Sequence, residues 1–89
     1  MKTMELHITN RLGLHARAAA KLVHMASEYE SDIFLSLNQE EVNAKSILGL
    51  LTLAATKGTT LGLRVVGIDE EGASRAIASL FEDKFGEGE

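Results

Sequence analysis

The spacing of apolar residues alternates along this 89-residue chain between a period of two and a period of three to four. A period of two predicts a strand with one buried face, and it occurs in three segments, at 4–8, 33–37 and 61–65. A turn at Asn38-Gln39 leads into a short fourth strand over 40–43. We therefore expect a hairpin in the middle of the chain and four strands in total.

Apolar residues at three- and four-residue spacing predict helices between these strands. The first helix begins near Ala16 and extends to Tyr29. The second is short and is capped by Ser46, and the third follows Asp69, a natural N-cap. The tail over 86–89 has nothing to bury and is expected to fray.

The resulting order is strand, helix, strand, strand, helix, strand, helix, which predicts an α+β fold. A four-stranded, largely antiparallel sheet with the helices on one face buries the apolar faces most economically. Residues 1–89 should form one domain, because a chain of this length has no room for a second. The sequence contains no cysteine, which excludes disulfides, thiolate metal sites and cysteine nucleophiles.

Charge and hydropathy exclude two further classes of function. Nine Lys and Arg against thirteen Asp and Glu give a net charge of −4 without a basic cluster, which disfavours nucleic-acid binding. The longest apolar stretch, 47–55, is about half the length that crosses a bilayer. The first residues carry no secretory signal, so a cytoplasmic location is expected.

Three histidines are the main candidates for chemistry. His7 lies on the polar side of the first strand and His24 within the first helix, so both are interpreted as solvated or partly packed. His15 lies at the start of a helix, where unpaired amide groups and the helix dipole favour an anion. A neutral imidazole there is a nucleophile, and Arg17 can bind phosphoryl oxygens. Alternatively, His15 simply caps the helix and Arg17 is solvated.

The second helix offers another pair of interpretations. Ser46 is either only a cap or a phosphorylation site whose added charge the helix dipole tolerates. The helix has more apolar residues than one buried stripe needs. Either it is buried all round, or Ile47, Leu48 and Leu51 form an exposed docking patch for a partner protein. No pair of histidines has the spacing of a metal site on a helix, and neither a metal nor a cofactor is expected.

Two segments resemble one known family. Residues 10–19, Asn-Arg-Leu-Gly-Leu-His-Ala-Arg-Ala-Ala, resemble the active-site loop of HPr, the histidine-containing phosphocarrier of the bacterial phosphoenolpyruvate-dependent phosphotransferase system. Residues 42–49, Val-Asn-Ala-Lys-Ser-Ile-Leu-Gly, resemble the second motif of that family, around its regulatory serine. The two motifs stand about thirty residues apart, and the resemblance covers essentially the whole chain.

The resemblance implies an open-faced β-sandwich with βαββαβα order and a monomeric carrier rather than an enzyme. His15 is implied to accept a phosphoryl group on Nδ1 from phosphorylated Enzyme I and to pass it to IIA proteins, with Arg17 stabilising that group. Ser46 matches the serine phosphorylated by HPr kinase/phosphorylase, and Ile47, Leu48 and Leu51 match the docking surface. Positive charge is then expected near Arg17, with Lys45 as a further candidate.

Two features leave alternatives open. Many members of the family have proline directly after the motif arginine, where this chain has Ala18, so the helix start should be slightly less rigid and have one more amide donor. A sugar-transport carrier and its nitrogen-related counterpart share the histidine motif. The other candidate class is a purely regulatory module that keeps the fold and docks to partners without carrying phosphate.

Overall fold

Four strands form one antiparallel sheet in the computed structural model, which describes residues 1–88. The strand order across the sheet is β1-β4-β2-β3, so the last strand of the chain lies in the centre. The strands are β1 (Lys2–His7), β2 (Asp32–Leu37), β3 (Glu40–Asn43) and β4 (Thr60–Val66). All three pairings are antiparallel, and β2 and β3 form the expected hairpin.

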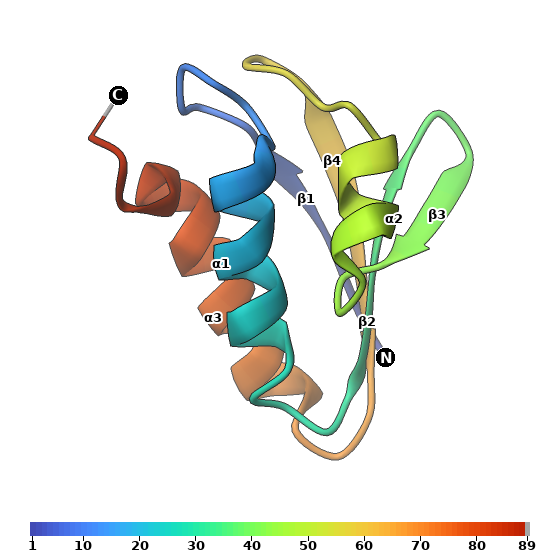
Figure 1. Ribbon diagram of the computed structural model, residues 1–89. Helices are drawn as coiled ribbons and strands as arrows, with labels where there is room; N and C mark the ends of the chain where they lie inside the picture. The colour runs from blue at the N-terminus through green and yellow to red at the C-terminus, as the bar shows by residue number, and fades with distance from the viewer. Residues whose placement is uncertain (89) are drawn as a thin grey trace.

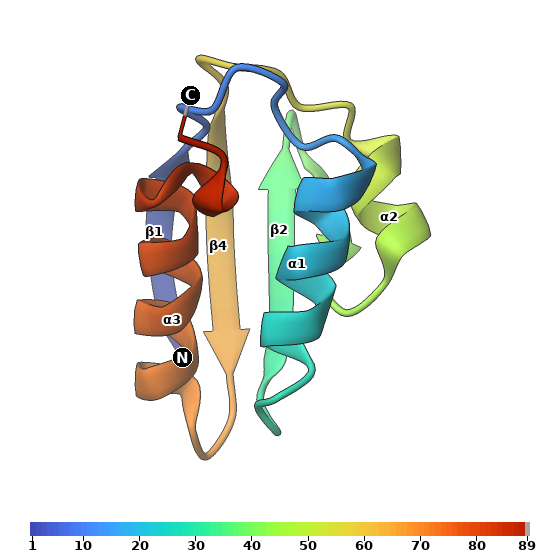
Figure 2. The same cartoon turned by 60° about the vertical axis from the view of Figure 1, so that its left-hand side comes forward.

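The helices cover one face of this sheet, as Figures 1 and 2 show. They are α1 (Ala16–Ala26), α2 (Ile47–Thr52) and α3 (Glu70–Glu82), followed by the short 3₁₀ helix η1 (Lys84–Gly86). Alternate residues of the central strand β4 face the helices and are buried, namely Leu61, Leu63 and Val65. The predicted α+β fold, an open-faced sandwich with three helices on one face, is confirmed.

Two helix predictions need correction. Helix α1 ends at Ala26 rather than Tyr29, because the amides of Glu28 and Tyr29 bond to carbonyls only three residues back and the chain turns toward β2. Asp69 occupies the N-cap position of α3, but its side chain makes no capping bond. Its carboxylate instead accepts hydrogen bonds from the backbone amides of Glu30 and Ser31 and from the Ser31 hydroxyl. Asp69 therefore joins the start of α3 to the loop before β2.

The C-terminal segment is packed against the domain at Phe85, directly before the tail over 86–89 that the sequence predicts to fray. Phe85 is 1% exposed, and its ring centroid lies 4.9 Å from that of Phe81. Lys21 Nζ donates a hydrogen bond of 2.6 Å to the Phe85 carbonyl oxygen. Buried aromatic area and a bond from α1 thus hold the chain at Phe85, and Glu87 accepts a hydrogen bond from Asn10. Of the last two residues of the predicted frayed tail, Gly88 is exposed and Glu89 lies outside the described residues.

No helix within residues 1–88 is both long and apolar enough to span a bilayer.

Candidate functional site

His15 is the N-cap residue of α1, as predicted, but its imidazole does not cap the helix. The residue has extended backbone angles, φ −78° and ψ 178°, and its carbonyl oxygen accepts the Ala19 amide at 2.8 Å. Its side chain makes no capping hydrogen bond. Among residues 1–88, the amides of Ala16, Arg17 and Ala18 at the helix start have no backbone acceptor. The imidazole of His15 therefore leaves these amides at the helix start without a capping acceptor.

The loop before His15 is fixed to the rest of the domain. Leu14 is buried, and its amide donates to the Ala55 carbonyl oxygen at 2.9 Å. Gly13 has a φ of +67°, which favours glycine, and it lies directly against Ala55. The Asn10 side-chain amide donates to the Gly13 carbonyl oxygen at 2.8 Å. These contacts hold the backbone on which His15 is presented.

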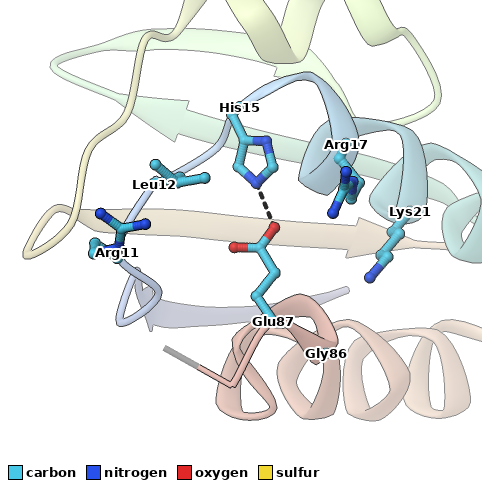
Figure 3. Close-up of a pocket in the computed structure, with 7 residues that line it drawn as sticks. All are labelled: Arg11, Leu12, His15, Arg17, Lys21, Gly86 and Glu87. Carbon is cyan, nitrogen blue, oxygen red and sulfur yellow. Dashed lines mark hydrogen bonds and ion pairs between the residues drawn. The ribbon is translucent and has the colours of Figure 1, made fainter.

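A shallow pocket of about 450 Å³ opens beside the His15 ring (Figure 3). The loop contributes Arg11 and Leu12, α1 contributes Arg17 and Lys21, and the C-terminal segment contributes Gly86 and Glu87. Three cationic side chains and one carboxylate thus line the same hollow as His15. Such a set of charges favours a multiply charged anion such as a phosphoryl group.

The sequence predicted only one of the three cationic side chains that line this pocket. Arg17 lines it as expected, but Arg11 and Lys21 were missed. Lys21 lies four residues after Arg17 on the same helix face, and this spacing was a usable signal. Lys45 is not part of the pocket, since its Nζ donates instead to the Tyr29 carbonyl oxygen at 2.7 Å.

Glu87 is the functional candidate that no sequence pattern indicated. Its Oε2 accepts a hydrogen bond from His15 Nε2, and its Oε1 accepts one of 3.0 Å from Asn10 Nδ2. Figure 3 shows Nδ1 on the side of the ring turned toward the start of α1, away from Glu87. Partial burial raises the pKa of the Glu87 carboxyl. The hydrogen bonds from His15 and Asn10, with the charges of His15 and Lys21, lower that pKa more, so the net shift is downward and Glu87 is held as a carboxylate.

Ser46 caps α2 as predicted, with its Oγ accepting the Gly49 amide at 3.1 Å. Leu50 is buried, but Ile47, Leu48 and Leu51 are 40%, 74% and 37% exposed. The interpretation of α2 as buried all round is therefore wrong. Helix α2 lies alongside the N-terminal half of α1, the helix that begins after His15 (Figures 1 and 2).

His7 and His24 lie outside the pocket. His7 Nδ1 lies 3.0 Å from the Thr60 hydroxyl on the sheet, and His24 is exposed near Glu28. No group of three or more potential metal ligands occurs within the described part of the chain, residues 1–88.

The sequence is similar to a family model and to several phosphocarrier proteins. Residues 2–83 match the family model described as the PTS HPr component phosphorylation site. The phosphocarrier protein HPr of Xylella fastidiosa is 52% identical over 83 residues, covering 93% of each chain. That of Neisseria meningitidis is 46% identical over 89 residues, the full length of both chains. The phosphocarrier protein NPr of Shewanella violacea is 42% identical over 83 residues, covering 93% of this chain and 91% of its own.

Solved structures with a similar fold are also HPr proteins. A crystal structure of HPr from Thermoanaerobacter tengcongensis superposes with a TM-score of 0.95 at 44% identity, covering 98% of both chains. The fold and the phosphorylation-site match together define a class, the phosphocarriers of the phosphotransferase system. Within this class, the chain belongs to the HPr family. Enzyme I and IIA proteins are the general kinds of partner that this family implies.

Proposed function

We propose that His15 is the residue that carries the phosphoryl group, on Nδ1. The observation that carries the proposal is an N-cap histidine whose Nδ1 is turned toward the start of α1, beside unpaired backbone amides and a cationic pocket. The His15 side chain is 26% exposed, so a partner protein can reach it. A carrier needs an exposed acceptor of this kind, because successive partners must approach the same atom.

The transfer is a single displacement at phosphorus. The lone pair of Nδ1 attacks the phosphorus atom of a phosphohistidine on Enzyme I, the Nδ1–P bond forms, and the donor N–P bond breaks with its electron pair returning to the donor imidazole. The amides at the start of α1 and the guanidinium of Arg17 bind the phosphoryl oxygens. The reverse displacement, with a histidine of a IIA protein as nucleophile, unloads the carrier. The phosphate is held only transiently, and no metal or cofactor takes part.

The α2 surface supports the accompanying roles. Ile47, Leu48 and Leu51 are the apolar contacts for partner docking, because they are exposed and belong to α2, which lies beside the helix that begins after His15. Ser46 begins the same helix, so phosphorylation by HPr kinase/phosphorylase would place about two negative charges beside this patch and oppose docking. The protein acts as a cytoplasmic monomer that meets one partner at a time.

The experiment measures phosphoryl uptake and then phosphoryl release with purified components. With Enzyme I and phosphoenolpyruvate, the protein should gain one phosphoryl group, and addition of a IIA protein should remove it. A Leu48→Glu variant should slow both stages, whereas Ile68→Glu should slow neither, because Ile68 is also exposed but follows β4 at the opposite end of that strand from the His15 loop. Docking that is indifferent to His15→Ala, with no phosphoryl uptake by the wild-type protein, would support the purely regulatory role instead.

The NPr relative at 42% identity supports a second candidate, a carrier for the nitrogen-related branch. The two branches are separated by offering the phosphorylated protein a sugar-specific and a nitrogen-related IIA protein in competition. The IIA protein that is phosphorylated faster identifies the branch.

A further inference from the structure

The carboxylate of Glu87 is placed to act on His15 through the ring nitrogen that the phosphoryl transfer does not use. Glu87 Oε2 accepts the hydrogen bond from Nε2, whereas Nδ1 lies on the other side of the ring. Glu87 lies four residues beyond the last residue that the family model matches, position 83, so the family match does not assign it a role.

The position of Glu87 is fixed from two sides. Asn10 is fully buried and its amide donates to Glu87 Oε1 at 3.0 Å and to the Gly13 carbonyl oxygen at 2.8 Å. The Asn10 side-chain oxygen has no hydrogen-bond partner among residues 1–88. The side-chain hydrogen bonds of this buried residue are therefore both donated by its NH₂ group. Buried Phe85 and the bond from Lys21 to the Phe85 carbonyl oxygen hold the chain two residues earlier. The contact with His15 is therefore supported by its own neighbours.

A carboxylate in this place determines where the imidazole proton resides. A neutral histidine has one N–H and one lone pair, and which nitrogen has which depends on the hydrogen bond made by the ring. Because a carboxylate only accepts, Glu87 selects the tautomer with the proton on Nε2. The lone pair is then on Nδ1, the nucleophilic position of the proposed function.

The same carboxylate also opposes the charge that develops during attack. When Nδ1 of this tautomer bonds to phosphorus, the ring retains its Nε2 proton and becomes positively charged, and no proton has to leave. An anion bonded to Nε2–H stabilises this imidazolium, as an aspartate does in a serine protease triad. Arg11, Arg17 and Lys21 line the other parts of the pocket, so Glu87 is the one carboxylate among its described lining residues.

We propose that Glu87 is a positioning residue for phosphoryl uptake, which holds His15 with its proton on Nε2 and its lone pair on Nδ1. This inference rests on the proposed function, since Nδ1 is the acceptor there. Glu87 touches neither donor nor phosphoryl group in the proposal and acts only through His15.

The test combines ¹⁵N NMR of the unphosphorylated protein with single-turnover uptake from phosphorylated Enzyme I. In the wild type, His15 should show its proton on Nε2. In Glu87→Ala, the Nδ1–H tautomer should appear and the uptake rate constant should fall about tenfold. Glu87→Gln retains an acceptor oxygen without the charge, so it should preserve the tautomer with an intermediate rate constant. Glu82→Ala removes an exposed carboxylate outside the pocket and should match the wild type.

The possible results distinguish failure of the role of Glu87 from failure of the proposed function of His15. If Glu87→Ala retains both the wild-type tautomer and the wild-type rate constant while remaining folded by its amide spectrum, the inference is overturned. If Glu87→Ala and Glu87→Gln are slowed equally with unchanged tautomers, the role is structural and the inference is again wrong. If the wild-type protein takes up no phosphate, the proposed function fails, whereas the tautomer measurement still judges the contact with Glu87.

Discussion

Gly13 packs so closely against Ala55 that a Cβ atom at position 13 would lie 2.6 Å from the Ala55 carbonyl oxygen. The same oxygen accepts the Leu14 amide at 2.9 Å, one residue before His15. The segment after α2 thus forms the support on which the histidine loop rests. The placement of His15 depends on this backbone contact between two distant parts of the chain.

Replacing Gly13 by alanine should therefore be costly. We expect Gly13→Ala to lower the free energy of unfolding by about 2 kcal/mol, because a left-handed φ and a backbone clash are combined. Gly58→Ala is the matched control, since Gly58 also has a positive φ but a Cβ there meets no atom within 4 Å. It should cost about 1 kcal/mol. Urea unfolding of both variants measures the difference, and equal losses would show that the Ala55 contact is irrelevant.

Ala54 offers the opposite change at the end of α2. Its φ is +51° and its side chain is exposed, so a residue with a Cβ occupies a left-handed position that glycine favours. Ala54→Gly should raise the free energy of unfolding by about 0.5 kcal/mol. The same substitution at exposed Ala20, within α1, should lower it by about 1 kcal/mol. Thermal and urea unfolding should rank the two variants on opposite sides of the wild type.

Asp69 should make stability depend on pH in the acid range. The Ser31 hydroxyl and the Glu30 and Ser31 amides bond to its carboxylate and hold its pKa below the ordinary value of 3.8. Because the pKa is lower in the folded than in the unfolded protein, this stabilisation is complete above the unfolded value and is lost as the pH falls through the folded one. Asp69→Asn should be less stable near neutrality and should show a smaller loss of stability on acidification.

The measurement for Asp69 is the urea midpoint followed from neutral pH into the acid range. Asp32→Asn is the control, because Asp32 is an exposed carboxylate at the start of β2 and lies beside the same loop. A wild-type acid dependence that persists unchanged in Asp69→Asn would contradict the assignment of this effect to Asp69.

Ser46→Asp should separate regulation from folding. Aspartate is as good an N-cap as serine, so the bond to the Gly49 amide is retained and the free energy of unfolding should change little. The added charge lies beside the exposed apolar patch of α2, so phosphoryl uptake from Enzyme I should slow by roughly tenfold. Thr3→Asp adds the same charge at an exposed position of β1 and should leave uptake unchanged. Equal rates in both variants would remove Ser46 from the regulatory role.

The elements that sequence predicted well are those determined by local chemistry. The start of α1 at Ala16 and the strand Glu40–Asn43 were confirmed at their predicted residues. In the latter case, Asn38 and Gln39 both have positive φ values, 52° and 70°, so the turn that fixes the hairpin register lies in two adjacent residues. The Ser46 cap is similarly local, since its partner is only three residues away.

The parts that sequence did not predict depend on contacts between distant residues. Glu87 reaches His15 across 72 positions of sequence, and it is held there by the packing of Phe85 on Phe81 and by bonds from Lys21 and Asn10. The carboxylate of Asp69 matches an N-cap signal, but tertiary structure directs it to a loop 38 residues earlier. Helix and strand signals describe neighbours along the chain, so they cannot reveal which side chain completes a site from another element.

His15 is the proposed phosphoryl acceptor, and all the roles proposed above depend on it. The direct measurement is the intact mass of wild type, His15→Ala and His24→Ala after incubation with Enzyme I and phosphoenolpyruvate. Wild type and His24→Ala should each gain one phosphoryl group that is lost in acid and stable in base, and His15→Ala should gain none. Uptake by His15→Ala at the wild-type level would show that His15 is not the phosphoryl acceptor.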